Sequence, residues 1–193
     1  MKTYKTRFLL SAPNASVFPV PDLPEIAVVG RSNSGKSTLI NILVGQRGLA
    51  KVSGKPGRTR AINFFEVEER YQLVDLPGYG FASGPKNEKV NWGKLVGSYF
   101  ASERPLKGVL ALFDIRRQPN ELDKILLTMF RKHQITWQAI WTKADKIKKS
   151  QLAKRTKELN RLFNCSAAGI AASSKSRLGR DEILEWIEQR VLG

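Results

Sequence analysis

Cysteine and histidine are nearly absent from this chain of 193 residues, which contains one of each, Cys165 and His133. A lone thiol cannot form an internal disulfide, so the simplest expectation is a cytoplasmic chain in which Cys165 is a small buried apolar residue. His133 lies in a predicted helix and is expected to be structural or exposed. No apolar run approaches the ~20 residues of a membrane span, and residues 1–10 lack the apolar segment of a secretion signal.

Acidic residues are also few, since 17 Asp and Glu face 33 Lys and Arg, which gives a formal net charge of +16. The basic residues are spread along the chain, so the folded surface itself must be positive. Such a surface attracts polyanions through counterion release, with little sequence specificity. Nucleic acid, and RNA in particular, is the expected partner. An acidic membrane surface, or charge that serves only solubility, stays open.

The composition, 41% hydrophobic and 26% charged, suits a single α/β domain with a real core. The chain shows no internal repeat and no low-complexity block. Four prolines between residues 11 and 24 oppose a regular helix. Residues 1–24 are therefore predicted to be an extended lead-in, and residues 25–193 the domain itself.

The most informative stretch is GRSNSGKS at residues 30–37, which matches the phosphate-binding pattern GxxxxGK[ST]. The apolar run at 26–29 predicts a strand buried on both faces of a parallel sheet. Residues 38–44 place apolar side chains at helical spacing and stop at Gly45, a typical C-terminal cap. Strand, loop and helix in this order are the context that the motif requires. A chance Gly/Ser turn beside a solvated lysine is the alternative.

Each position of this phosphate loop has a chemical reason. A tight loop that leads into a helix N-terminus offers backbone N–H groups and the positive end of the helix dipole to a polyphosphate. Gly30 and Gly35 allow the backbone to approach the phosphates without a Cβ in the way. Lys36 is expected to reach the β- and γ-phosphates, and the Ser37 hydroxyl to ligate Mg²⁺.

A second motif, Asp75-Leu76-Pro77-Gly78, follows a predicted pair of strands at 61–67 and 71–74. Near a phosphate loop, Asp75 fits a carboxylate that acts on Mg²⁺, and Gly78 fits a backbone N–H that senses the γ-phosphate. Taken alone, DxxG is also an ordinary turn. Its position on the strand after the phosphate loop favours the functional interpretation.

A third motif, the base tetrad Thr142-Lys143-Ala144-Asp145, follows a predicted strand at 135–141. Guanine presents its N1–H and 2-amino group side by side, and the Asp145 carboxylate can accept from both. Adenine has no such pair of donors and would leave the carboxylate unpaired. Lys143 can lay its aliphatic stem along the purine face. Ser173-Ser174-Lys175 can offer a backbone N–H to the guanine O6, although Ser-rich loops are common.

The remaining segments alternate strand with helix, which is typical of a doubly wound sheet. The predicted strands are 108–113, 135–141 and 169–172, and the predicted helices are 88–102, 121–132 and 180–191. Basic and apolar residues mix through 150–163.

These motifs, in this order, resemble those of translation-factor-class GTPases. More closely, the chain resembles the EngB/YihA family of bacterial ribosome-assembly GTPases over nearly its whole length. The segments that carry this resemblance are GRSNSGKSTLIN, PGRTRAINFF, DLPGYG and TKADK. The resemblance implies a Ras-like GTP-binding domain over 25–193, with three α/β/α layers around a mostly parallel six-stranded sheet that has one antiparallel strand. It also implies GTP and Mg²⁺ binding, a role in maturing the large ribosomal subunit, and a need for the protein in normal division and septation.

The resemblance and the motifs together predict the site residues. Lys36, Thr59 and Gly78 are expected to serve hydrolysis, and Ser37 and Thr59 to ligate Mg²⁺, with Thr59 assigned by the resemblance alone. The residues expected to bind the nucleotide are Gly30, Arg31, Ser32, Asn33, Ser34, Gly35, Lys36, Ser37, Thr38, Gly57, Arg58, Thr59, Arg60, Ala61, Asp75, Leu76, Pro77, Gly78, Thr142, Lys143, Ala144, Asp145, Ala172, Ser173, Ser174 and Lys175.

Three positions depart from the usual pattern. Tyr79 follows DxxG where Ras-like enzymes place a water-orienting glutamine, which predicts slow intrinsic hydrolysis. Asn33 occupies a position that supplies an oxygen ligand to K⁺ in related GTPases, although an asparagine also suits a turn. Thr142 stands where most GTPases carry asparagine, and because a hydroxyl makes fewer bonds than an amide, nucleotide affinity is expected to be modest.

The expected cycle is a switch in which bound γ-phosphate and Mg²⁺ draw in Thr59 and Gly78 and order the loops 46–60 and 76–85. The basic residues in or beside these loops are Lys51, Lys55, Arg58, Arg60 and Lys86. A second basic patch is expected from Lys146, Lys148, Lys149, Lys154, Arg155 and Lys157, unless these side chains form only a solvated helix face.

The hypothesis is that a monomer in the GTP form docks on the rRNA of a large-subunit precursor and that hydrolysis releases it. One alternative is a GTP-dependent protein-binding switch at the division site without direct RNA contact. Another is a P-loop kinase or ATPase, which would not account for a tetrad that recognises guanine.

Overall fold

The computed structural model describes residues 3–50, 61–80 and 86–193. The strands are β1 (Thr6–Ala12), β2 (Glu25–Gly30), β3 (Ile62–Val67), β4 (Tyr71–Asp75), β5 (Leu106–Asp114), β6 (Trp137–Thr142) and β7 (Ile170–Ala171). The α-helices are α1 (Lys36–Val44), α2 (Lys86–Ala101), α3 (Glu121–Lys132), α4 (Lys149–Leu162) and α5 (Arg180–Leu192). The elements predicted from residue 26 onward are present, and only their ends are shifted.

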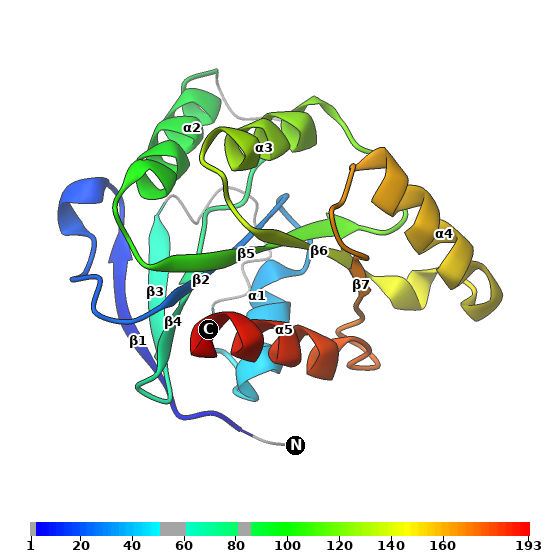
Figure 1. The fold of residues 1–193 in the computed structure, drawn as a ribbon, viewed down its shortest axis with the longest axis horizontal. Helices are drawn as coiled ribbons and strands as arrows, with labels where there is room; N and C mark the ends of the chain where they lie inside the picture. The colour runs from blue at the N-terminus through cyan, green and yellow to red at the C-terminus, as the bar shows by residue number, and fades with distance from the viewer. Residues whose placement is uncertain (1–2, 51–60, 81–85) are drawn as a thin grey trace.

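The strands form one sheet in the order β1-β3-β4-β2-β5-β6-β7, as Figure 1 shows. β2 is parallel to β4 and β5, and β6 is parallel to β5 and β7, whereas β3 is antiparallel to both of its neighbours, β1 and β4. The expected α/β class with one antiparallel strand is confirmed. The expected count of six strands is one too low, because residues of the predicted lead-in form β1 at the edge of the sheet.

The position of the prolines explains this extra strand. The first of the four, Pro13, follows β1 directly, so every residue of β1 keeps its backbone donor. Thr6 pairs with Val67, and Phe8 packs edge-on against Phe65 with ring centroids 5.6 Å apart. From Pro13 to β2 the one regular element is the 3-10 turn Ala15–Val17.

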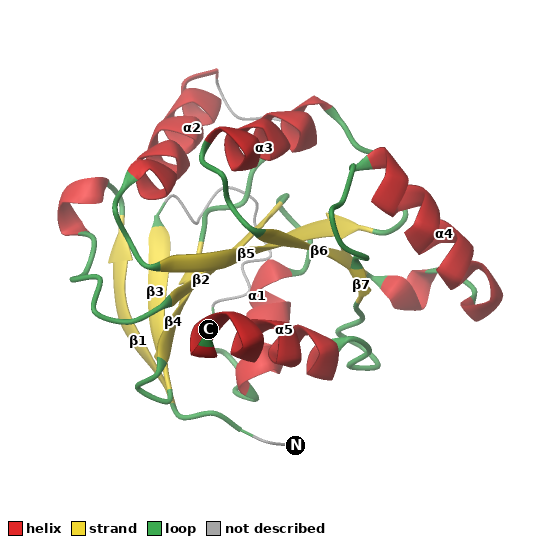
Figure 2. Ribbon diagram, in the orientation of Figure 1, coloured by secondary structure: helices red, strands yellow, loops and turns green. Residues whose placement is uncertain are grey.

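Helices cover both faces of the sheet (Figure 2). On one face, α2, α3 and α4 contribute Tyr99, Phe130 and Leu159 to one hydrophobic cluster. On the other face, α1 and α5 contribute Ile40 and Ile183 to a second cluster. β2 lies between the clusters and is buried along its whole length, as its continuous apolar run predicts. Within the described residues, no helix has the length and apolar character that crossing a bilayer requires.

A buried ion pair secures the edge where β2 begins. Glu25 is fully buried and accepts hydrogen bonds from the Arg104 Nε (2.9 Å) and the Tyr99 hydroxyl (2.7 Å). Arg104 also donates to the Pro19 carbonyl (2.8 Å), and its guanidinium lies over the Phe64 ring. These contacts attach the proline-rich segment to the sheet.

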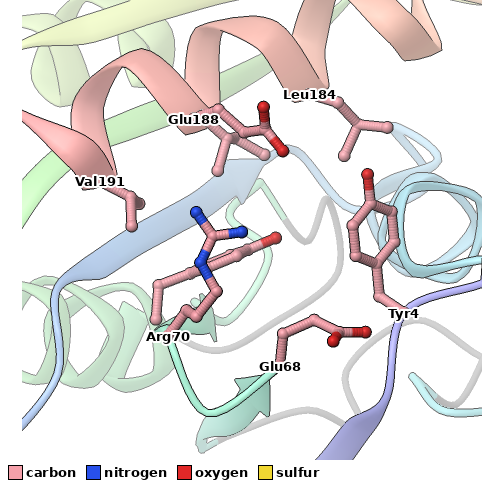
Figure 3. A pocket seen from close by; sticks show the side chains of 8 residues that line it. Tyr4, Glu68, Arg70, Leu184, Glu188 and Val191 are labelled. Atoms are coloured by element: carbon pink, nitrogen blue, oxygen red, sulfur yellow. The ribbon is translucent and has the colours of Figure 1, made fainter.

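Figure 3 shows a small hollow at the edge where β4 begins, between α5 and the turn that joins β3 to β4. Its lining residues are Tyr4, Glu68, Arg70, Tyr71, Leu184, Ile187, Glu188 and Val191. The volume of about 10 Å³ accommodates roughly one water molecule. This hollow is therefore too small for a nucleotide, and it lies at the opposite edge from the sequence motifs.

Candidate functional site

The three sequence motifs meet at one edge of the sheet. β2, β4 and β6 are parallel, and their last residues are Gly30, Asp75 and Thr142. Only β5 separates β2 from β6, so their ends lie about 10 Å apart at the usual spacing between strands. In open α/β sheets, ligands bind in the crevice beyond the carboxyl ends of the strands. The phosphate loop and the base tetrad thus follow strand ends at one edge of the sheet, and the region beyond this edge, where a ligand is expected, is called the crevice.

The backbone of the phosphate loop has the conformation that its sequence predicts. Asn33 (φ 64°) and Gly35 (φ 90°) are left-handed, and α1 begins immediately afterwards at Lys36. A Cβ on Gly30 would lie 2.6 Å from the Ser34 Oγ, so only glycine fits there. The Ser34 hydroxyl is buried beneath the loop and has no hydrogen-bond partner among the described residues. An anion cradled by the loop would meet the backbone N–H groups at the start of α1.

Lys36 and Asp75, which the sequence assigns to different parts of the ligand, contact each other directly. The Lys36 ammonium donates to Asp75 Oδ1, and both side chains are buried. Asn63 lies opposite Asp75 on β3 and donates to its second oxygen (3.3 Å). The Ser11 hydroxyl donates to the Asn63 amide oxygen (2.7 Å), which orients the amide. Asn63 was not predicted as a site residue, because its role depends on the register between β3 and β4.

The segment after Asp75 runs beside the phosphate loop. Ser32 N–H donates to the Tyr79 carbonyl (2.8 Å), and Tyr79 N–H donates to the Gly30 carbonyl (3.3 Å). A Cβ on Gly78 would lie 3.3 Å from the Ser32 nitrogen, so glycine allows the two segments to approach closely. Gly78 is therefore positioned beside the loop, as expected for a backbone group that senses the γ-phosphate.

Tyr79 itself is part of the core. Its hydroxyl donates to Asp123 Oδ1 on α3 (2.7 Å), and its ring packs against Trp92 on α2. Burial, together with the Asp123 carboxylate, raises the pKa of Tyr79 far above its ordinary value. The Trp92 indole also donates to the Pro77 carbonyl (2.7 Å). The sequence shows that Tyr79 stands where a water-orienting glutamine is usual. It does not show that Tyr79 is held by Asp123 and Trp92, because these contacts form only in the tertiary fold.

The base tetrad forms the other end of the crevice. Thr142 uses its hydroxyl to donate to the Phe113 carbonyl on β5 (3.1 Å). Lys143 is left-handed (φ 61°), and its ammonium pairs with Asp114 at 3.1 Å. Burial raises the pKa of Asp114, but hydrogen bonds from Arg116 and Lys143 outweigh this effect and hold the pKa well below its ordinary value. Asp114 is therefore an anion that holds Lys143 in place beside the end of β6.

Asp145 lies at the surface and meets the serine-rich loop that the sequence also predicted. The Ser173 hydroxyl donates to Asp145 Oδ1 (2.7 Å) and lowers the pKa of this carboxyl. The backbone N–H of Lys175 donates to the Ser173 oxygen (3.2 Å), and Ala144 N–H donates to the Ala172 carbonyl (3.0 Å). The structure thus brings the tetrad and residues 172–175 together, as a common base-recognition end requires, with a carboxylate of lowered pKa at the surface.

Two further residues hold this end in place and were not predicted. The Asn160 amide oxygen on α4 accepts from the Trp141 indole and from the Gly169 N–H, both at 3.0 Å. Arg180, which follows the serine-rich loop, donates to the Ile42 carbonyl (2.8 Å) and to the carbonyl of the next residue at the C-terminus of α1. Since α1 begins at Lys36, Arg180 joins the base end to the helix of the phosphate end.

The predicted residues Gly57, Arg58, Thr59 and Arg60 lie outside the described residues, and Ala61 directly precedes β3. The phosphate loop, Asp75–Gly78, the base tetrad and Ala172–Lys175 are all located at the crevice. This fold, with a phosphate loop and a base-recognition end at one sheet edge, defines a Ras-like P-loop GTPase domain.

Comparisons with known proteins agree with this class. The family described as 50S ribosome-binding GTPase matches residues 25–143. A probable GTP-binding protein EngB of Desulfosudis oleivorans is 42% identical over 93% of this chain and 92% of its own length. The EngB protein of Caldanaerobacter subterraneus is 40% identical over 99% of both chains. The chain belongs to the EngB family of GTP-binding proteins.

Solved structures show the same fold at lower sequence identity. The crystal structure of a probable GTP-binding protein EngB has a TM-score of 0.72 at 23% identity and covers 86% of this chain and 98% of that one. Era in complex with MgGDPNP and a segment of 16S ribosomal RNA has a TM-score of 0.69 at 19% identity and covers 87% of this chain and 56% of that one.

Proposed function

We propose that this GTPase is a nucleotide-dependent switch in the assembly of the large ribosomal subunit, and that normal cell division and septation need it. The observation that carries the proposal is the joint placement of the phosphate loop and the base tetrad at one sheet edge, in a chain of the EngB family with a net charge of +16. Nucleotide binding supplies the switch, and the positive surface supplies attraction to rRNA.

Guanine recognition is assigned to the base tetrad. The ionised Asp145 carboxylate would accept from the N1–H and 2-amino groups, and Ser173 already supports it with a hydrogen bond. Lys143, held by Asp114, would lie along the purine face. Selectivity for GTP over ATP in a competition titration tests this assignment, and equal affinity would favour a P-loop kinase or ATPase instead.

The residues present fit a Mg²⁺ ion. Ser37 offers a hydroxyl in the first turn of α1, and the Asp75 carboxylate lies beside Lys36 at the end of β4. The described residues contain no cluster of three or more His, Cys, Asp or Glu that could hold a metal alone. Mg²⁺ in such sites takes one or two protein oxygens together with phosphate oxygens. Ser37 and Thr59 are the proposed protein ligands, and the bound ion would neutralise charge on the β- and γ-phosphates.

Intrinsic hydrolysis is proposed to be slow, because the position after DxxG holds an anchored core tyrosine in place of a water-orienting glutamine. Catalysis would then depend on charge from Lys36 and on backbone groups such as Gly78. Rapid phosphate release by the isolated protein in sodium buffer would contradict this view.

A K⁺ ion near Asn33 is a further part of the proposal. The left-handed backbone of Asn33 already explains an asparagine at this turn, so the side chain needs its own test. Asn33→Gly keeps the backbone conformation and removes the amide oxygen. We expect wild type to hydrolyse GTP faster in KCl than in NaCl and Asn33→Gly to lose this difference. Equal wild-type rates in the two salts would exclude the ion.

Sedimentation with large-subunit precursors tests the ribosomal role. We expect co-sedimentation with GTP but not with GDP, weakened steeply by salt, and accumulation of precursors on gradients after depletion of the protein. Normal precursor profiles, with retention of the protein by division-site proteins, would favour the protein-binding switch.

A further inference from the structure

Positive charge is concentrated on one helix of the fold. α4 contains five Lys or Arg and one carboxylate, Glu158, and two further lysines lie between the base tetrad and the helix. α5, on the other face of the sheet, contains two cations and four carboxylates. α4 lies at the end of the molecule next to β6 and β7 (Figure 1). The net charge therefore has a strong regional bias toward α4.

Within α4 the cations form a row. Lys154, Lys157 and Arg161 are exposed and follow one another at spacings of three and four residues, so they share one stripe of the helix. Leu159, on the opposite side, is fully buried in the core. The row extends over about 10 Å of helix. A linear row of cations matches a linear polyanion better than a single anion.

Arg155 has a different role from its neighbours. Its guanidinium donates to the carbonyls of Ile115 (2.8 Å) and Arg117 (2.9 Å), and it pairs with Glu158 at 2.9 Å. Because its guanidinium is occupied within the protein, Arg155 is not available to bind an external anion as part of the expected basic patch. Arg155 instead neutralises Glu158, the one carboxylate of α4. Its hydrogen bonds also hold the loop with the exposed Arg116 and Arg117 beside the helix.

We propose that the α4 ridge, defined as Lys154, Lys157 and Arg161, binds the phosphate backbone of RNA; this inference rests on the ribosomal role proposed above. The apolar side of α4 is packed on the core, so the helix has no free apolar face to insert into a membrane. The ridge contains no aromatic side chain for base stacking. Binding through the ridge is therefore electrostatic and independent of RNA sequence.

The ridge also lies outside the loops 46–60 and 76–85, which are proposed to sense the γ-phosphate. It supplies a constant share of RNA affinity, whichever nucleotide is bound. Dependence on GTP then comes from the loops alone. The ridge therefore differs from the switch loops in that its contribution to RNA affinity does not depend on the bound nucleotide.

The test compares two triple variants with equal loss of charge. Lys154→Gln, Lys157→Gln and Arg161→Gln remove the ridge, whereas Lys124→Gln, Arg131→Gln and Lys132→Gln remove three exposed cations from α3, on the same face of the sheet. Binding to a short RNA duplex is measured by fluorescence anisotropy over a range of salt, with GDP and with a non-hydrolysable GTP analogue. Vesicles of anionic lipid serve as the second probe.

We expect the α4 variant to bind RNA about 10- to 100-fold more weakly and to lose about two to three units of the salt slope, equally with both nucleotides. The α3 variant should stay close to wild type, and both should bind GDP normally. Equal losses in the two variants, or loss of vesicle binding with RNA binding intact, would overturn the proposal. Failure of wild type to associate with large-subunit precursors would instead count against the ribosomal role.

Discussion

The phosphate end and the base end of the crevice are built differently. At the phosphate end, Lys36 and Asp75 form a buried ion pair whose side chains are 9% and 4% exposed. At the base end, Asp145 lies at the surface and is supported by Ser173. The residues proposed to bind the phosphates are thus also part of the folded core, whereas the residue proposed to select the base lies at the surface. We therefore expect substitutions at the first end to lower both stability and affinity, and at the second end affinity alone.

The largest effect is expected from Lys36→Ala. Among the residues that the structure describes, removing the ammonium leaves the buried Asp75 carboxylate with only the weak Asn63 side-chain contact, so the free energy of unfolding should fall by about 3–5 kcal/mol. GTP affinity should fall by at least about 100-fold, because charge-assisted contacts to phosphate are lost. Chemical denaturation without nucleotide and titration with a fluorescent GTP analogue measure the two effects.

The double variant with Lys36→Met and Asp75→Asn provides the control. Its buried carboxylate is gone, so stability should recover in part while GTP affinity stays low. A Lys36→Ala protein as stable as wild type would show that the pair does not support the phosphate end.

The second largest effect is expected from Asp145→Asn. An amide cannot accept from both guanine donors, so GDP affinity should fall by about 100-fold, with unfolding close to wild type. Xanthine carries a carbonyl where guanine has its 2-amino group, so the new amide can donate to it. Xanthosine diphosphate should therefore bind the variant better than the wild type. A loss of stability as large as that of Lys36→Ala would remove the contrast between the two ends.

Arg180→Met tests whether the two ends act together. The variant loses the hydrogen bonds from Arg180 to the C-terminal carbonyls of α1, so the free energy of unfolding should fall by about 2–4 kcal/mol. GDP affinity should fall by about tenfold, because α1 and the serine-rich loop lose their shared support. Arg180→Lys, which keeps the charge but not the fork of donors, should give intermediate values.

A matched control comes from the opposite end of the parallel strands, where β2 begins at Glu25. Arg104→Met breaks the buried pair with Glu25 and should lower stability at least as much. Because this pair is remote from the crevice, GDP affinity of the folded Arg104→Met protein should match wild type. Equal affinity losses in the two variants would mean that general destabilisation, rather than the link through α1, explains Arg180→Met.

Most of the fold follows from local signals in the sequence. The buried strand at 26–29, the helix that stops at Gly45 and the alternation after it depend on patterns within a few residues, and the structure contains all of them. β1 was not predicted, because its place in the sheet depends on pairing with β3, whose partner residues are 50 to 61 positions away in the sequence. The four prolines of the lead-in all follow β1, so they do not prevent a strand at Thr6–Ala12.

The site shows the same division. Motifs placed the phosphate loop, Asp75 and the base tetrad correctly at one edge, because each motif is a continuous stretch. Asn63, Asp123, Asn160 and Arg180 have no motif, and each acts through a partner brought near by the tertiary fold. Their identity as polar residues was visible in the sequence, but their partners were not.

The smallest effect is expected from Tyr79→Phe. This substitution tests whether the side chain that follows the motif Asp75–Gly78 takes part in catalysis. The Tyr79 hydroxyl donates to the buried Asp123, so its removal leaves one carboxylate oxygen without this partner and should lower the free energy of unfolding by about 1–3 kcal/mol. Because the hydroxyl is bound to α3, the rate of GTP hydrolysis should change by less than about threefold. Single-turnover phosphate release at saturating enzyme measures this rate without interference from nucleotide affinity. A drop of tenfold or more, with unchanged stability, would mean that Tyr79 leaves Asp123 in the GTP form and acts on the attacking water, and the phosphate end would then be less fixed than its buried contacts indicate.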